Sequence, residues 1–311
     1  MIRIGFFGTP EIASCCLEEL CGDFHVSFVV AGEDKPAGRH QHMMHCAAKG
    51  SAMCRDIPIL QPHSLRDPAF IDTIKKFDAD IYVVVAYGKI IPREIFDHPR
   101  LKTINLHPSL LPRYRGAAPV PWAIIRGETE TGVTVQIINE ELDAGDIIVQ
   151  EKVRIHENMT AGELYDVVIP MGSRMLSRAI GLLASGDAMP RPQDPAEATY
   201  CGKITRELAA VDWTRPSAEI HNLVRGLNPK PGAWTLFRGK NLKIWGTLRA
   251  EDCGEDLRPG ELHVRGKKTL LAGTGSGCIE ITSIQPETKK TMDGPSFING
   301  YRLTAGDSFG V

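Results

Sequence analysis

The 311-residue sequence has no hydrophobic run near the roughly 20 residues that a membrane-spanning helix needs. The chain reaches a Gly-Thr-Pro turn by Pro10, which is too early for the apolar segment of a signal peptide. Aromatic residues make up only 6% of the chain, but hydrophobic residues make up 42% and charged residues 24%. This balance is typical of a globular protein with a sizeable core. We therefore expect a cytoplasmic protein that does not enter a membrane.

The sequence also lacks any C-x-x-C pair among its eight cysteines. That spacing is typical of zinc sites and of thioredoxin-like redox sites. Cys15 and Cys16 are adjacent in a helix-like stretch, and the other cysteines are scattered. For a cytosolic chain of this length we expect reduced and mostly buried thiols.

A dinucleotide-binding fingerprint is missing as well. The segment Gly5 to Pro10 lies at the first strand-to-helix turn, but it lacks the G-x-G-x-x-G pattern. Pro10 also removes a helix-start amide that would face a phosphate. These two absences argue against a nicotinamide-dependent dehydrogenase.

Charge is nearly balanced overall, with a formal net charge of −2, but it is uneven along the chain. Residues 1–200 carry 20 basic and 26 acidic side chains, whereas residues 201–311 carry 16 and 12. The basic excess is concentrated in 201–250, with nine basic against three acidic side chains. Such an excess is a weak indication of a polyanionic partner, and a solvated surface explains it equally well.

The first half of the chain alternates short apolar runs with helical patterns, which is typical of an α/β fold with a parallel sheet. The segment 79–87 is almost entirely apolar, as a central strand covered on both faces must be. We predict a Rossmann-like α/β domain over 1–187, with strands at 2–7, 25–31, 57–60, 79–87, 101–106, 133–138 and 147–153, and helices at 10–20, 68–77 and 160–184.

The second half has a different pattern. Residues 188–200 are rich in proline and polar side chains, and we predict a linker over 188–204. Residues 205–311 then form the second domain, which contains a short helix at 217–227 and short strands separated by Gly and Pro. This pattern predicts a small OB-like β-barrel. Its expected strands are 234–237, 242–247, 260–264, 269–272 and 278–284.

Candidate catalytic residues follow the strand at 101–106. Asn105 and His107 are two residues apart, so their side chains share one face of the strand. An amide donor and an imidazole together suit an oxyanion that develops on a carbonyl. Asp143 lies in the later turn DAGD, and a nearby carboxylate orients an imidazole and favours its charged form. This spacing is compatible with direct acyl transfer to an amine, but a structural histidine and a simple tight turn remain open alternatives.

The stretch Asn105 to Gly116, NLHPSLLPRYRG, resembles the signature of the folate-dependent formyltransferases, and 127–146 resembles its continuation. The resemblance implies a Rossmann-like transferase domain with Asn105, His107 and Asp143 as its catalytic set. It also implies 10-formyltetrahydrofolate as a co-substrate, with no tightly bound cofactor and no metal. The implied folate contacts are Ser109, Leu110, Leu111, Pro112, Tyr87, Gly88, Ile90 and Ile91. Lys89 interrupts that last group where an apolar residue is expected.

Two regions resemble those members of the family that formylate methionine on initiator tRNA. The segment Lys35 to Arg39 resembles the start of an inserted loop, and NPKPGAW at 228–234 resembles part of their second domain. The resemblance then runs nearly end to end and implies initiator methionyl-tRNA as a partner, with no obligate protein partner. The implied tRNA contacts are Lys35, Arg39, Lys240 and Lys243. Tyr114 and Arg115 are further candidates for substrate contact, although an exposed arginine is most often only solvated.

The inserted loop departs from the family after Arg39, because His40, His42 and His45 stand where paired lysines are usual. We expect this loop to bind the phosphates of tRNA more weakly or in a pH-dependent way. These histidines and Cys46 could also be metal ligands, but they lie in one segment without a group to orient them. Two other functions remain open: formylation of a nucleotide-linked amino sugar, and RNA binding without catalysis.

Overall fold

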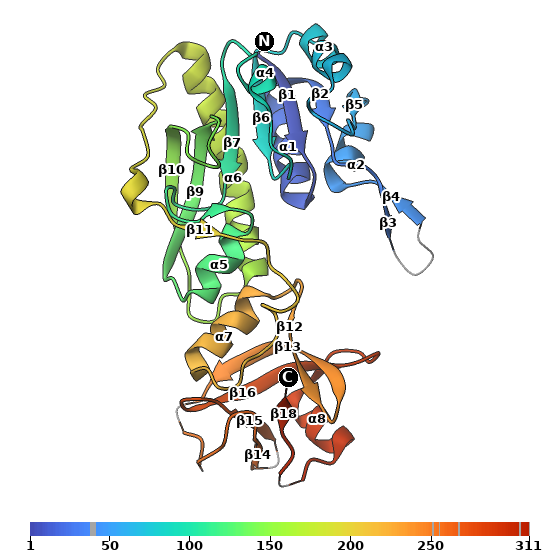
Figure 1. Cartoon of the computed structure of the whole chain (residues 1–311), viewed down its shortest axis with the longest axis vertical. Coiled ribbons are helices and arrows are strands. Elements are labelled where there is room, and N and C mark those ends of the chain that lie inside the picture. The colour runs from blue at the N-terminus through green and yellow to red at the C-terminus, as the bar shows by residue number, and fades with distance from the viewer. Residues whose placement is uncertain (38–41, 251, 255, 267, 305, 311) are drawn as a thin grey trace. The chain divides into compact units, whose positions relative to one another are not determined.

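A computed structural model describes residues 1–37, 42–250, 252–254, 256–266, 268–304 and 306–310 (Figure 1). These residues form two compact units. The first unit comprises Met1–Pro119, Thr131–Val153 and Asp166–Cys201, and the second comprises Val120–Glu130, Arg154–Tyr165 and Gly202–Val311. The proposed linker at 188–204 therefore continues the first unit as far as Cys201 before the chain enters the second.

The first unit is built on a seven-stranded sheet with the order β10-β9-β7-β6-β1-β2-β5. Strands β5, β2, β1, β6 and β7 pair in parallel, whereas β9 is antiparallel to β7. The α/β class is confirmed, and the sheet is mixed rather than parallel throughout. The strands are β1 (Arg3–Gly8), β2 (His25–Val30), β5 (Ile59–Leu60), β6 (Ile81–Val85), β7 (Thr103–His107), β9 (Glu130–Ile137) and β10 (Ile147–Arg154).

Helices cover both faces of this sheet. On one face, α3 (Pro68–Lys76) and α4 (Arg93–Phe96) contribute Phe70, Ile74, Ile95 and Phe96 to an apolar cluster with strand residues such as Tyr82. The other helices of the unit are α1 (Glu11–Asp23), α2 (Ala47–Met53) and, from Asp166 onward, α6 (Ala161–Ser185).

Helix α6 is long and apolar enough to cross a membrane by length and composition, and it is the one helix of that kind among the described residues. It packs instead against other elements of the first unit. The Ser173 hydroxyl donates to Cys16 Sγ of α1 over 3.3 Å. A Cβ at Gly172 would meet Leu106 Cδ2 of β7 at 2.8 Å, so glycine permits close packing on the sheet. These contacts are those of a partly buried core helix.

The strand order reverses direction at β1. The chain adds β2 and β5 on one side of β1, and then returns to add β6 and β7 on the other. In such sheets ligands bind where the strand order reverses, beyond the carboxyl ends of the strands. The loops after β1 and β6 meet there, because the Thr9 hydroxyl donates to the Tyr87 carbonyl over 3.2 Å. The predicted catalytic strand β7 ends beside β6 at the same edge.

Two small sheets accompany the main one. Strands β3 (Lys35–Ala37) and β4 (His42–Met44) pair in an antiparallel direction. Strand β8 (Arg115–Gly116) pairs in parallel with β11 (Tyr200–Cys201), and a 3-10 turn, η1 (Pro195–Glu197), precedes β11. The linker segment is thus hydrogen-bonded to the loop that follows β7.

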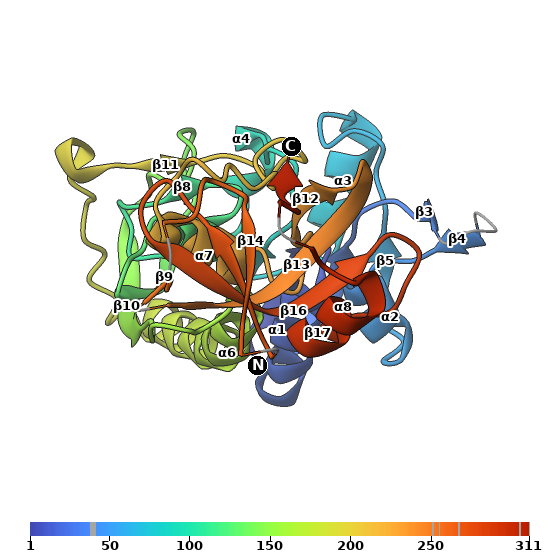
Figure 2. The same cartoon turned by 90° about the horizontal axis from the view of Figure 1, so that it is seen from below.

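The second unit contains an antiparallel sheet of order β14-β15-β16-β13-β12-β18, with β17 paired to β16. Figure 2 shows β13 and β16 side by side. The sheet closes because the Leu262 amide donates to Asp307 O and the Phe309 amide to Gly260 O. A barrel-like antiparallel domain is confirmed. Its strands are β12 (Ala233–Phe237), β13 (Lys240–Arg249), β14 (Leu262–Arg265), β15 (Thr269–Gly273), β16 (Cys278–Pro286), β17 (Met292–Asp293) and β18 (Phe309–Gly310).

Two helices complete the core of the second unit. Helix α7 (Ser217–Gly226) and helix α8 (Gly294–Tyr301) bury Ile220, Val224 and Phe297 against the strands. Helix α8 was not predicted, because Pro295 and two glycines obscure its pattern. It begins with the Asp293 side chain, which accepts the Ser296 amide over 2.8 Å. Helix α5 (Pro119–Ile125) also lies mainly in this unit.

The cysteine prediction is wrong in two respects. Cys253 and Cys278 form a disulfide across 25 residues of chain, so not every thiol is reduced. Of the six free cysteines, only Cys16 and Cys201 are buried. The pair could not be seen from spacing, because β16 and the loop before β14 come together only when the sheet forms.

Candidate active site

The end of β7 presents two polar side chains on one face. The intervening Leu106 packs toward α6, so the alternation of the strand directs Asn105 and His107 to the opposite face. His107 is only 4% exposed, and Asn105 is half-buried. The alternation of a β-strand therefore separates the polar pair from the core.

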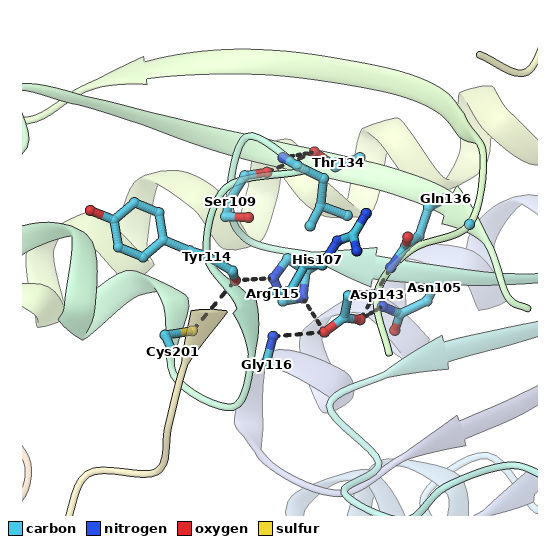
Figure 3. A network of polar contacts seen from close by, with 12 residues as sticks. Asn105, His107, Ser109, Tyr114, Arg115, Gly116, Thr134, Gln136, Asp143 and Cys201 are labelled. Carbon is cyan, nitrogen blue, oxygen red and sulfur yellow. Dashed lines mark hydrogen bonds and ion pairs between the residues drawn. The ribbon is translucent and has the colours of Figure 1, made fainter. Parts of the chain in front are cut away.

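Asp143 faces both of these side chains (Figure 3). Asn105 Nδ2 lies 3.4 Å from Asp143 Oδ1, and His107 Nδ1 lies 3.7 Å from Asp143 Oδ2. Two shorter hydrogen bonds reach the same carboxylate: Gln136 Nε2 donates to Oδ1 over 3.1 Å, and the Gly116 amide donates to Oδ2 over 2.9 Å. The structure thus brings the three predicted catalytic residues together around a carboxylate with several donors.

The turn that carries Asp143 has a special backbone. Asp143 itself has φ 50°, in the left-handed region that Asp and Asn adopt more readily than most residues. A Cβ at Gly145 would overlap the Ile137 carbonyl oxygen, so only glycine lets the turn pass this close to β9. The backbone conformation of the turn therefore explains two residues of DAGD, Asp143 and Gly145.

The contact that orients His107 comes from the main chain. His107 Nε2 lies 2.8 Å from the Tyr114 carbonyl oxygen, which can only accept. Nε2 therefore carries a hydrogen, and Nδ1 is the ring atom that faces Asp143. Cys201 Sγ donates to the same carbonyl over 3.4 Å. Sequence reasoning assigned the orienting role to Asp143 and considered Tyr114 only as a possible substrate contact.

The loop Ser109–Pro112 is held against β9 and β10. Thr134 Oγ1 donates to Ser109 O over 2.6 Å, and Gln150 Nε2 donates to Leu111 O over 2.9 Å. Ser109 is fully buried, and its hydroxyl donates to Arg113 O. Leu111 is also buried, whereas Leu110 and Pro112 are half-buried. Of these four candidates, Leu110 and Pro112 have side-chain surface left for a ligand.

The other candidate folate residues lie in the turn after β6. Tyr87 and Ile91 are buried, whereas Ile90 is 86% exposed. Gly88 has φ 83° and open space where a Cβ would lie. Lys89, whose role the sequence left open, extends to the Pro62 carbonyl oxygen at 2.9 Å. The turn therefore presents a glycine and an apolar side chain to solvent.

A hollow of about 440 Å³ lies between two segments that lead to the site. One segment is α4, which follows the turn after β6, and the other is 137–141, which precedes Asp143. Their lining includes Phe96, Ile137 and Ile138 together with polar groups of Arg93 and Glu141. A mixed lining of this kind suits an aromatic ligand with polar edges.

Burial separates Tyr114 and Arg115 from the surface. Each side chain is 4% exposed, so Arg115 is neither solvated nor placed on an open substrate face. Tyr114 has φ 61°. The residues that sequence reasoning missed are main-chain groups of 114–116, Gln136 of β9 and Gln193 of the linker segment. Residues 114–116 and Gln136 lie within the two stretches that resemble the family, but the sequence does not show what these groups contact, and Gln193 lies in no motif at all.

The candidate tRNA residues are spread over both units. Lys35 and Lys240 are exposed. Lys243 is exposed too, but its ammonium group donates to Pro231 O over 2.8 Å and lies over the Trp245 ring. Arg39 and His40 lie outside the described residues.

Carboxylates partly neutralise the basic stretch 201–250. Arg238 pairs with Asp307 at 2.8 Å, and the guanidinium groups of Arg215 and Arg249 also lie beside carboxylates. Arg225 is buried and donates to the Met159 carbonyl. Among the described residues, no carboxylate pairs with Lys203, Lys230 or Lys240. The cationic surface is therefore smaller than the count of nine suggests.

An amide and an imidazole at the end of β7, together with a carboxylate in the turn after β9, suit acyl transfer without an enzyme nucleophile. Comparison with known proteins agrees with this class. Residues 4–180 match the family described as Formyl transferase, and residues 203–302 match Formyl transferase, C-terminal domain.

Similar proteins extend over the full length. Methionyl-tRNA formyltransferase of Agathobacter rectalis is 39% identical over 309 residues, covering 99% of each chain. The protein of that name from Geobacter sulfurreducens is 39% identical over 311 residues, covering 99% of this chain and 97% of its own. The chain therefore belongs to the formyl transferase family and, within it, to the methionyl-tRNA formyltransferases.

Solved structures share the fold at lower identity. The sugar 3N-formyl transferase WlaRD, solved with dTDP and 5-N-formyl-THF, aligns with a TM-score of 0.67 at 20% identity and covers 93% of this chain and 99% of its own. HypX from Aquifex aeolicus in complex with tetrahydrofolic acid aligns with a TM-score of 0.66 at 20% identity, covering 98% of this chain and 48% of its own. These likenesses extend to both units.

Proposed function

We propose that this protein transfers the formyl group of 10-formyltetrahydrofolate to the amino group of methionine on initiator tRNA in the cytoplasm. The observation that carries the proposal is the convergence of Asn105, His107 and Asp143 in a chain that matches methionyl-tRNA formyltransferases from end to end. The folate is a co-substrate that enters and leaves.

The chemistry begins with attack of the neutral amine on the formyl carbon. Asn105 Nδ2 uses one hydrogen for Asp143, so the second hydrogen remains for the oxygen of the tetrahedral intermediate. In the imidazolium form, His107 donates from Nδ1, because the Tyr114 carbonyl occupies Nε2. Two donors aimed at one developing oxyanion lower the barrier by several kcal/mol, at about 3 kcal/mol for each donor.

Asp143 completes the reaction as an acceptor. Its Oδ2 lies 3.7 Å from His107 Nδ1, close enough to stabilise the imidazolium. The proton that the amine loses passes through this carboxylate, directly or by one water, to the leaving folate nitrogen. The new amide bond forms as the bond between the formyl carbon and that nitrogen breaks, so atoms and charge balance.

The folate and the tRNA approach different surfaces. We place the pterin against the turn at Tyr87, Gly88, Ile90 and Ile91 and along α4, which follows that turn and lines the hollow with residues 137–141. We assign the loop Ser109–Pro112 to the same ligand. We assign the tRNA to Lys240 and Lys243 of the barrel and to Lys35 of β3. Arg39 belongs to the same proposal.

The decisive experiment offers the purified protein three acceptors with 10-formyltetrahydrofolate: methionyl initiator tRNA, free methionine and a dTDP-linked amino sugar. We expect formyl-methionine only on the tRNA. The Asn105→Ala variant serves as the matched inactive protein. Formylation of the sugar alone would replace the proposed acceptor, and no formylation of any acceptor would reject the catalytic assignment.

A further inference from the structure

Gln193 lies in the proline-rich linker segment, but its side chain is directed into the active-site network. It is 9% exposed. Its Nε2 lies 2.9 Å from Asp143 O, 2.8 Å from Gly145 O and 3.0 Å from Gln136 Oε1. One linker amide thus contacts both ends of the short turn that carries Asp143 and also the glutamine that binds its carboxylate.

A buried arginine decides which way this amide points. Arg115 donates to Gln193 Oε1 from Nε over 3.2 Å and from a terminal nitrogen over 2.8 Å. A guanidinium group has only donors, so the atom of Gln193 that faces it must be the oxygen. The amino group is then fixed toward Gln136 and the two carbonyl oxygens.

The same argument determines the orientation of the Gln136 side-chain amide. Gln136 is 2% exposed and accepts from Gln193 at its Oε1, so its own amino group must face Asp143. Gln136 Nε2 indeed donates to Asp143 Oδ1 over 3.1 Å. The chain of hydrogen bonds therefore has one direction, from Arg115 through Gln193 and Gln136 to the carboxylate. In a buried network, such bonds polarise and strengthen one another.

The later part of the linker segment positions the donor that binds the second carboxylate oxygen of Asp143. Strand β11 pairs with β8, with Tyr200 opposite Arg115 and Cys201 opposite Gly116. The Gly116 amide on that strand donates to Asp143 Oδ2 over 2.9 Å. Both oxygens of Asp143 are thus held by groups that residues 193–201 position.

We propose that Gln193 is a positioning residue of the active site, which Arg115 orients and which sets the placement of Asp143 through Gln136 and the turn carbonyls. The proposal rests on the proposed formyl transfer. It assigns a role in catalysis to a segment that the sequence marks only as a linker. Gln193 and Arg115 touch no substrate in this scheme, and they act through the residues that do.

The test compares Gln193→Glu with Gln193→Met. The Gln193→Glu side chain still accepts from Arg115 and adds a negative charge beside that guanidinium group. It places an oxygen, however, where the amino group of Gln193 faced the three acceptor oxygens of Gln136, Asp143 and Gly145. Methionine keeps the length and loses all the hydrogen bonds. Both should lower kcat about tenfold to a hundredfold through misplacement of Asp143, with KM for folate and tRNA changed less than threefold. Gln285→Glu is the matched control, because Gln285 likewise accepts from Trp245 and donates to Lys289 O.

A double-mutant cycle tests the direction of the relay. If Arg115 acts through Gln193, the Arg115→Met variant should lose kcat, and Arg115→Met/Gln193→Met should lose no more than Gln193→Met alone. Multiplicative losses would show that Arg115 acts independently and would overturn the relay. Wild-type kcat in both folded Gln193 variants would overturn the positioning role itself.

A readout without substrate separates this inference from the proposed function. In protein labelled with 15N-glutamine, the side-chain amide resonances of Gln136 should shift in Gln193→Met and stay unchanged in Gln285→Glu. If wild-type protein formylates no acceptor, the proposed function fails, and the Gln136 resonances still decide the network. Unchanged Gln136 resonances in Gln193→Met would overturn the inference even if formyl transfer is observed.

Discussion

His107 Nε2 lies 2.8 Å from the main-chain oxygen of Tyr114. This bond fixes the orientation of the ring and leaves Nδ1 toward Asp143. Tyr114 reaches this position because its backbone is in the left-handed region, with φ 61°, and because its amide donates to Thr199 Oγ1. A side-chain substitution cannot delete the Tyr114 carbonyl, so the orientation of His107 depends on the fold of the loop.

Loss of either donor should reduce turnover strongly. We expect Asn105→Ala and His107→Ala each to lower kcat by about a hundredfold or more, as removal of one oxyanion donor does. Folate affinity, measured by tryptophan fluorescence quenching, should change far less. Near-normal kcat in either variant would show that the reaction occurs elsewhere.

The Asp143→Asn variant removes the negative charge of the carboxylate but keeps the shape of the side chain. Asparagine also tolerates the left-handed backbone at this position, so the variant should still fold. Its amino group, however, must face either the Gly116 amide or the donors Gln136 and Asn105, and the carboxylate charge beside His107 is gone. We expect kcat to fall by about a hundredfold or more. Full activity at normal stability would remove the proposed role of the charge.

The barrel lysines should determine part of the salt dependence of tRNA binding. Each phosphate contact contributes about 0.7 to 0.9 to the slope of log affinity against log salt. Lys240→Ala/Lys243→Ala should therefore reduce that slope by about one to two, and Lys76→Ala on α3 should leave it unchanged. The measurement is filter binding between low and moderate salt. An unaltered slope in the double variant would move the phosphate contacts away from β13.

His221 should make stability depend on pH. Burial lowers the pKa of His221 below its ordinary value of 6.5, although its bond to the Glu157 carbonyl opposes the shift. The unfolded chain therefore binds the proton first, and stability falls as pH decreases through about 6.5 toward the lower folded value. His221→Gln should flatten the unfolding free energy over that window. A variant with the same pH slope as wild type would assign the slope to other groups.

The disulfide should stabilise the second unit. Closing a loop of 25 residues removes conformational freedom from the unfolded chain, worth about 3 to 4 kcal/mol in the chain-entropy estimate. Cys253→Ser and treatment with a reducing agent should cause the same loss in urea unfolding, and the reducing agent should add nothing to the variant. Equal stability of reduced and oxidised protein would mean that the bond does not restrain the unfolded state.

Helices and strands with a clear period were predicted well from sequence. The helix expected at 217–227 is α7 at Ser217–Gly226, and the strand expected at 25–31 is β2 at His25–Val30. Short elements were missed, among them β8 and β11, because two residues give no periodic pattern. The antiparallel direction of β9 was missed as well, because alternation does not reveal which way a strand pairs.

The sequence by itself determined the polar residues of the site: a strand of alternating residues places Asn105 and His107 on one face, and the turn DAGD favours the backbone of Asp143. Only the tertiary structure decided what holds them. Gln193 reaches Asp143 across 50 residues of chain, and Tyr114 reaches His107 through a main-chain carbonyl. Hydrogen bonds of this kind depend on where the backbone travels, and neither a main-chain group nor a single buried glutamine leaves a pattern in the sequence.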